Sequence, residues 1–189
     1  NPKISPKSLA KLANINDRNI AANVAGNPST PPEIIKKIVM GCKSFEASDN
    51  AASNPTSSNE TLKYILDNFI YVEIARKISA NTSAQEDVLL MLVDKMNGDE
   101  FDFHNDDRNY IATKILENPN VTERVIIELA KIDDKYVHRA IIDRYPHASI
   151  AVHMTIAEVG TYGGSHLAKN TPYPEVVDKL VKLSPCLSS

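Results

Sequence analysis

An Asn-Pro dipeptide, or a close variant of it, recurs through this 189-residue chain at nearly constant intervals. We call each of these points a corner. The intervals between successive corners are 26, 27, 27, 37, 27 and 25 residues. Proline disfavours the helical conformation of the residue before it, so each corner is expected to end a helix and to mark a period of about 27 residues. The corners are Asn1-Pro2, Asn27-Pro28, Asn54-Pro55, Asn81-Thr82, Asn118-Pro119, Tyr145-Pro146 and Asn170-Thr171.

The segment after each corner is predicted to be a helix, because its apolar residues keep the spacing of one helix face. These residues fall eight and eleven positions after the corner, as Leu62 and Ile65 do after Asn54. Ser57 and Glu60 are predicted to form a capping box at the start of this helix, in which both side chains bind free backbone N–H groups. Thr30 and Ser83 begin equivalent boxes.

The segment before each corner is predicted to be a second, shorter helix. Small or apolar residues stand seven, six, three and two positions ahead of the corner, and no segment shows the alternation of a strand. One such helix pair cannot bury its apolar face alone, so we predict an all-α solenoid of about seven two-helix repeats that forms one domain over residues 1–189. The residues expected to be buried are Ile20, Val24, Leu62, Ile65, Ile111, Ile115, Ile126 and Leu129.

Charge and cysteine content limit the possible partners. The net charge is −3, from 24 acidic and 21 basic residues, which argues against an extended nucleic-acid footprint. Cys42 and Cys186 have no pattern around them, and no apolar run is long enough to span a bilayer, so we expect a cytoplasmic protein without cofactor or metal. The chain starts within the repeat pattern at Asn1 and without Met, so we interpret it as a fragment of a longer protein or as a trimmed chain.

The string from Ile20 to Ile35, Ile-Ala-Ala-Asn-Val-Ala-Gly-Asn-Pro-Ser-Thr-Pro-Pro-Glu-Ile-Ile, resembles the leucine-rich repeat variant. That family repeats Val-Arg-x-x-Val-Ala-x-Asn-Pro-x-Thr-Pro before a Leu-containing helix. The resemblance extends over nearly the whole chain and implies a right-handed solenoid, although these longer units could pair two true helices as HEAT-like repeats do. The family's Arg, six positions before Asn, is retained only as Arg139. The other positions hold Ala21, Ser48, Ala75 and Ala112.

The 37-residue interval contains an acidic insertion at 97–107. Six acids and one lysine lie between Asp94 and Asp107. We predict that the insertion and the residues after it bind a protein partner, with two phenylalanines as anchors. A calcium loop and a solvated loop whose phenylalanines pack onto the helices are the alternatives. The residues predicted to bind the partner are Phe101, Asp102, Phe103, Asp106, Asp107, Arg108 and Tyr110.

A cationic group around Tyr136 is the second candidate site. It could bind an anion through His138, Arg139 and Arg144. The alternative, which we favour, is a set of salt bridges to nearby acids. The five histidines of the chain include no i, i+4 pair of the kind that holds a metal on a helix. The acids available for salt bridges are Asp133, Asp134 and Asp143.

No segment carries a recognisable catalytic motif. The glycine-rich stretch 160–165 lacks the Lys-Ser/Thr ending of a phosphate loop and is expected to bend the chain instead. We therefore predict a non-enzymatic interaction scaffold for a protein partner. The alternative is a nucleic-acid-binding HEAT-like protein related to DNA glycosylases, and a third possibility is one arm of a larger assembly.

Overall fold

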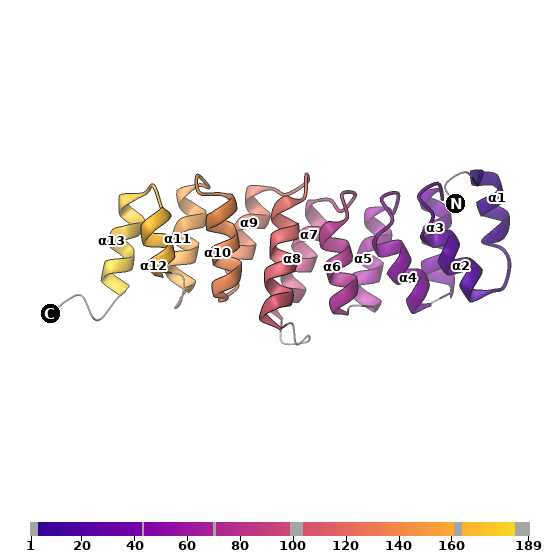
Figure 1. Ribbon diagram of the computed structural model, residues 1–189, viewed down its shortest axis with the longest axis horizontal. Helices are drawn as coiled ribbons and strands as arrows, with labels where there is room; N and C mark the ends of the chain where they lie inside the picture. The colour runs from indigo at the N-terminus through magenta and orange to yellow at the C-terminus, as the bar shows by residue number, and fades with distance from the viewer. Residues whose placement is uncertain (1–3, 43, 70, 99–103, 161–163, 184–189) are drawn as a thin grey trace. The chain divides into compact units, whose positions relative to one another are not determined.

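The computed structural model describes residues 4–42, 44–69, 71–98, 104–160 and 164–183. These residues form thirteen α-helices and no strand, which confirms the predicted all-α class (Figure 1). Within each full period one helix follows the corner and a second precedes the next corner, as the apolar spacing predicts. The helices are α1 (Pro6–Leu12), α2 (Arg18–Ala25), α3 (Pro32–Cys42), α4 (Phe45–Ala52), α5 (Asn59–Asn68), α6 (Val72–Ala80), α7 (Glu86–Asn97), α8 (Asn105–Glu117), α9 (Glu123–Ala130), α10 (Lys135–Arg144), α11 (Ile150–Val159), α12 (Gly164–Asn170) and α13 (Pro174–Leu183).

The chain divides into two compact units. The first comprises Asn1–Leu92 with Asn118–Asn120, and the second comprises Val93–Glu117 with Val121–Ser189. In the first unit α2 packs against α4 and α4 against α6, while α3 packs against α5 (Figure 1). In the second unit α8, α10 and α12 pack in the same order, and so do α9, α11 and α13. The single domain expected from the sequence stays a prediction.

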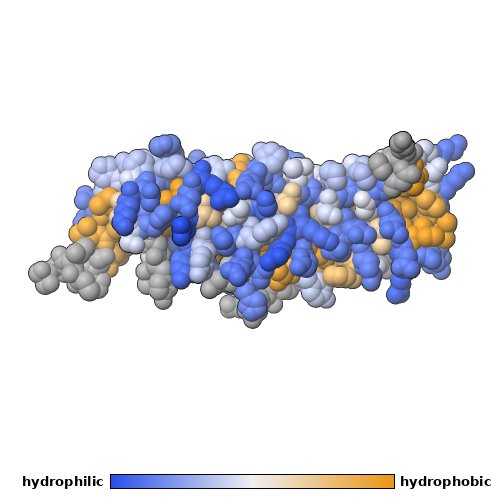
Figure 2. Space-filling model, viewed as in Figure 1, coloured by the Kyte–Doolittle hydropathy of each residue, from blue (hydrophilic) through white to orange (hydrophobic). Residues whose placement is uncertain are grey.

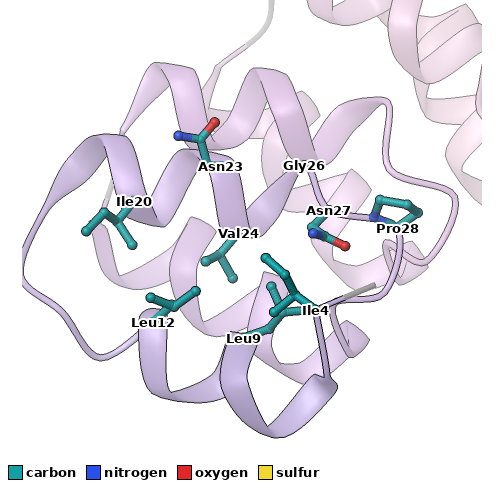
Figure 3. Close-up of a pocket in the computed structure, with 9 residues that line it drawn as sticks. All are labelled: Ile4, Leu9, Leu12, Ile20, Asn23, Val24, Gly26, Asn27 and Pro28. Atoms are coloured by element: carbon teal, nitrogen blue, oxygen red, sulfur yellow. The ribbon is translucent and has the colours of Figure 1, made fainter. Parts of the chain in front are cut away.

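Both units have aliphatic cores. Ile20 is the one residue for which the predicted burial is wrong, because it is only half-buried. It faces an open apolar hollow of about 400 Å³ that Leu9 and Leu12 also line (Figure 3). The helix that provides these leucines, α1, has only seven residues and leaves part of α2 uncovered. The residues buried as predicted are Val24, Leu62, Ile65, Ile111, Ile115, Ile126 and Leu129.

The corner asparagines of the first unit link successive corners. The side-chain amide of Asn54 donates to the carbonyl oxygens of Ala25 and Asn27, at 2.6 and 2.9 Å. Asn81 donates in the same way to Ala52 and to Asn54, at 2.8 and 3.0 Å. Both asparagines are buried, so these bonds satisfy carbonyl groups that water cannot reach.

The hydroxyl groups after the corners make a second set of links, which overturns the predicted capping boxes. Thr30 and Ser57 are buried and donate back across the corner, to the carbonyl oxygens of Val24 and Ala51. Ser58 is the N-cap of α5 instead, where it accepts from the N–H of Thr61. Pairing with a backbone carbonyl across the corner therefore prevails over local capping. Ser83 does not cap a helix either, but its hydroxyl donates to the carbonyl of Ser57, 26 residues earlier, as that of Thr56 does to Thr30.

The last corner lies one residue later than predicted. Thr171, not Asn170, accepts the N–H of the residue two positions on, as the corner asparagines do. Asn170 instead donates to the carbonyl of His166 within its own helix. Tyr173 then reaches back to the carbonyl of Ala148, 25 residues earlier. Helix α12, which precedes this corner, therefore ends one residue later than the spacing of the Asn-Pro-like dipeptides predicts.

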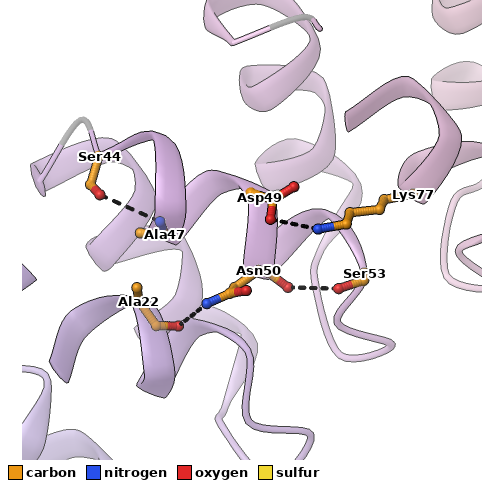
Figure 4. A network of polar contacts seen from close by, with 7 residues as sticks. All are labelled: Ala22, Ser44, Ala47, Asp49, Asn50, Ser53 and Lys77. Atoms are coloured by element: carbon orange, nitrogen blue, oxygen red, sulfur yellow. Dashed lines mark hydrogen bonds and ion pairs between the residues drawn. The ribbon is translucent and has the colours of Figure 1, made fainter. Parts of the chain in front are cut away.

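The α2–α4–α6 layer is close-packed and polar on its outer side. Asn50 on α4 donates to the carbonyl of Ala22 on α2, and Lys77 on α6 pairs with Asp49 (Figure 4). A Cβ at Gly26 would lie 3.2 Å from Cβ of Asn50, so α2 and α4 approach closely at this point. The face seen in Figure 2 is mainly hydrophilic, and hydrophobic residues gather at the α1–α2 end of the first unit.

Candidate interaction surface

Helix α8 carries the described part of the partner site predicted around the insertion. Asp106 is exposed on its first turn, Asp107 is buried and Arg108 is half-buried. Acidic side chains in the first turn favour the helix because they face its free N–H groups. Tyr110, one turn further on, is 39% exposed. The predicted anchors Phe101 and Phe103, together with Asp102, lie outside the described residues.

Helix α10 carries the predicted anion site, but it turns the three residues in different directions. His138 is completely buried, whereas the side chain of Arg139 is 70% exposed. Successive helix positions differ by about 100°, so these neighbours cannot share a surface. Asp134 is the N-cap and accepts from the N–H groups of Tyr136 and Val137. The structure therefore does not bring His138 onto the surface beside the two arginines.

The register of α10 differs by one residue from that of α2, α4 and α6, which also precede a corner. The positions six before a corner hold buried residues, such as Ala75. In α10 the corresponding buried position belongs to His138, because the helix runs one residue further before Tyr145. The N–H of Tyr145 binds the carbonyl four residues earlier, whereas that of Asn81 binds the carbonyl three residues earlier. His138 thus occupies the position that Ala75 has in α6, and Arg139 points outward.

The two arginines of this region form ion pairs, of which Arg139 with Asp143 is one that the salt-bridge alternative expects, whereas Arg144 pairs with Glu117. Glu117 accepts hydrogen bonds from Lys114 and Arg144, both at 2.8 Å, and these bonds lower the pKa of its carboxyl group. Asp143 pairs with His166 at 2.9 Å and with Arg139 at 3.4 Å. The hydrogen bond from His166 is the main cause of the lowered pKa of Asp143. The two carboxylates thus balance much of the local positive charge.

Two tyrosines stand exposed among these charges. Tyr110 is 39% exposed and Tyr136 is 36% exposed. The Lys114 ammonium lies 5.9 Å from the ring centroid of Tyr110, and that of Lys135 lies 4.9 Å from the ring centroid of Tyr136. Helices α8 and α10 pack against each other, and the ion pair between Arg144 and Glu117 joins their exposed sides. We call the exposed side of this helix pair the α8–α10 face, and its residues are Tyr110, Lys114, Glu117, Lys135, Tyr136, Arg139, Asp143 and Arg144.

The first unit has an exposed aromatic pair that the sequence analysis missed. Phe45 and Tyr71 are 44% and 59% exposed, and their rings meet edge to face with centroids 5.3 Å apart. Phe45 is the first residue of α4, and Tyr71 is the N-cap of α6. Their spacing of 26 residues, close to the repeat period, is the signal that could have revealed the pair.

Neither a metal-binding cluster nor a membrane-spanning helix is found in the described ranges. No group of three or more His, Cys, Asp and Glu side chains within them could hold a metal ion. None of the described helices combines the length and apolar character needed to cross a membrane.

Comparisons with protein-family models, with curated proteins and with solved structures find no match for this chain.

Proposed function

We propose that this protein is a non-enzymatic interaction scaffold that binds a protein partner through the α8–α10 face. The observation that carries the proposal is the exposure of Tyr110 and Tyr136 on two packed helices, each with a lysine beside its ring. Tyrosine and arginine contribute more than most residues to the binding energy of protein interfaces. An exposed ring that is already held by its own helix loses little conformational freedom on binding.

The charge pattern of the face favours a protein over a ligand of a single charge sign. Carboxylates of Glu117 and Asp143 alternate with the cations of Lys114, Arg139 and Arg144. Such a surface complements a partner that carries both signs, and complementary charges set the register and the rate of association more than the affinity. The acidic insertion, with Phe101, Asp102 and Phe103 as predicted contacts, would extend the same binding region from the start of α8.

The architecture that we propose for the scaffold is a right-handed α-solenoid of about seven repeats that forms one domain. Its support in the first unit is the set of bonds from Asn54 and Asn81 to carbonyls 27 and 29 residues earlier. In the second unit Tyr145 donates to Leu116, also 29 residues earlier. The resemblance to the leucine-rich repeat variant and to HEAT-like repeats agrees with this arrangement, and cytoplasm is the expected location.

Site-directed photocrosslinking tests the proposed face. A photoreactive phenylalanine analogue is placed at position 110 or 136, with position 71 of the first unit as the control. We expect a discrete crosslinked partner from the first two positions and a weaker product or none from the third. The partner is then purified, and Tyr110→Ala with Tyr136→Ala should weaken its binding by about tenfold or more. Equal crosslinking at all three positions, or unchanged affinity, would refute the proposal.

A nucleic-acid ligand is the second candidate, because Lys114, Lys135, Arg139 and Arg144 lie on the same two helices. The bonds that the two arginines and Lys114 make to carboxylates weigh against it. Binding to nucleic-acid phosphates strengthens strongly as salt is lowered. We expect no binding of DNA or RNA oligonucleotides by fluorescence anisotropy at low salt. A salt-dependent isotherm that is lost in Arg139→Gln would favour this second candidate.

A further inference from the structure

The histidines of this chain are confined to one of its two units. All five, at positions 104, 138, 147, 153 and 166, belong to the second unit, and the sequence of the first unit has none. Two of them, His138 and His153, are completely buried. Histidine is the side chain whose charge ordinarily changes between pH 5 and 8, so the two units differ in their capacity to respond to mild acid.

His138 has one ring nitrogen paired and the other enclosed without a partner. Its Nε2 lies 3.0 Å from the carbonyl oxygen of Ala130, so Nε2 carries the proton and donates it. Its Nδ1 is buried and has no hydrogen-bond partner among the described residues. Gly160 covers this side of the ring so closely that a Cβ there would lie 3.0 Å from Nδ1. A second proton on the ring would therefore have no hydrogen-bond acceptor among the described residues.

His153 has a similar arrangement in which the roles of Nδ1 and Nε2 are reversed. Its Nδ1 lies 2.8 Å from the hydroxyl oxygen of Thr171, and Tyr173 meets the ring edge to face at 5.3 Å. Its Nε2 is buried and has no hydrogen-bond partner among the described residues. In each ring one nitrogen is paired with a polar neighbour, while the other has no hydrogen-bond partner among the described residues.

We infer that His138 and His153 make the second unit sensitive to mild acid, so that lowering the pH loosens α10 and α11 while the first unit stays folded. Both rings are accommodated only in the neutral form, because an imidazolium needs an acceptor at each nitrogen. In the unfolded chain both rings can take up a proton freely in water. Protonation therefore favours the unfolded state of the second unit.

The surroundings of both rings agree with this direction. Burial lowers the pKa of His138, and it outweighs the opposing effects of the Ala130 and Ile132 carbonyls and of the Asp133 and Asp134 carboxylates. None of α8, α9 and α12, which pack against α10, provides a described charge that acts on this ring. Burial also lowers the pKa of His153, opposed only by the carbonyl of Tyr145. No described charge from α9, α12 or α13 acts on His153.

The sign of the pH dependence follows from these directions. Below the ordinary histidine pKa of about 6.5 the unfolded chain binds more protons than the folded one. Stability of the second unit is therefore complete above that pH and falls as the pH drops toward the lower pKa values of the folded state. Each buried histidine changes the unfolding equilibrium by up to about tenfold per pH unit, and the two together by up to about a hundredfold.

Hydrogen exchange of the whole chain tests the inference. Amide protection is measured by mass spectrometry between pH 7.5 and 5.0, and each rate is divided by the intrinsic rate at that pH. We expect protection in α10 and α11 to fall steeply below about pH 6.5, and protection in α4 and α6 to remain level. An equal response of both units, or none in α10 and α11, would overturn the inference.

Variants assign the effect to the two rings. His138→Gln keeps a donor near the Ala130 carbonyl, and His153→Asn keeps a polar group near Thr171. We expect the double variant to lose the steep pH dependence and the exposed-site control His147→Gln to retain it. Because a core substitution can prevent folding, the wild-type chain is also titrated by NMR. Two histidine ring signals should resist titration near pH 6.5, whereas normal titration of all five would contradict the inference.

Discussion

The side-chain amide of Asn54 donates a hydrogen bond of 2.6 Å to the carbonyl oxygen of Ala25, which precedes it by 29 residues. A second bond from the same amide reaches Asn27. Asn54 is 2% exposed, so its removal would leave both carbonyls without these bonds in a site closed to water. The asparagine of an Asn-Pro corner therefore does more than end a helix, because it also ties its corner to the preceding one.

Replacement of this amide should destabilise the chain. We expect Asn54→Ala to lower the free energy of unfolding by about 1–3 kcal/mol, the cost of leaving buried polar groups unpaired. Urea denaturation followed by circular dichroism measures the change. Asn68→Ala is the control, because Asn68 is exposed and bonds only within its own helix turn. If the two variants lose the same stability, the bonds to the preceding corner are not what stabilises the fold.

Tyr145 stands in place of asparagine at its corner, and a smaller change can be made there. The Tyr145 hydroxyl donates to the carbonyl of Leu116 at 2.9 Å, which continues the asparagine pattern with a longer side chain. Tyr145→Phe removes only this hydroxyl and should cost about 1 kcal/mol in the free energy of unfolding. Tyr71→Phe, at a ring that is 59% exposed, should be neutral in the same thermal or urea measurement. A neutral Tyr145→Phe would disprove the proposed equivalence.

Two glycines should respond to alanine in opposite directions. A Cβ at Gly160 would lie 2.8 Å from the carbonyl oxygen of Ile156 and 3.0 Å from the His138 ring, so Gly160→Ala should destabilise by about 1–3 kcal/mol. Gly41 lies within α3 and has open space around it. Gly41→Ala should therefore stabilise by about 0.5–1 kcal/mol, through the better helix propensity of alanine. Melting temperatures of the two variants should shift to opposite sides of the wild type.

Burial predicts the cost of core truncation. Ile65 is fully buried, so Ile65→Ala should cost about 2–5 kcal/mol from lost burial and the remaining cavity. Ile20 is half-buried beside an open hollow, and Ile20→Ala should cost about 1 kcal/mol. Urea midpoints of the two variants provide the comparison. A loss at Ile20 as large as that at Ile65 would show that the hollow is closed in solution.

Most of the fold follows from local sequence patterns. The helix around Leu62 and Ile65 depends on a spacing of three or four residues, and its end depends on the effect of a corner on the preceding backbone. Both signals act within one or two turns of chain, so a single sequence is enough to detect them. The binding roles predicted for the candidate sites stay predictions. Tyr110, Arg139 and Arg144 are exposed, whereas His138 is buried.

By itself, the sequence determined the helices, all but the last of the corners between them and nearly all of the aliphatic core, because these depend on neighbours close along the chain. The tertiary structure alone decided how polar side chains are used. Ser57 could cap a helix or bind Ala51, and the buried carbonyl is the partner that it meets. One extra residue before Tyr145 turns His138 inward and Arg139 outward. These outcomes depend on acceptors and cavities that exist only after distant segments pack together.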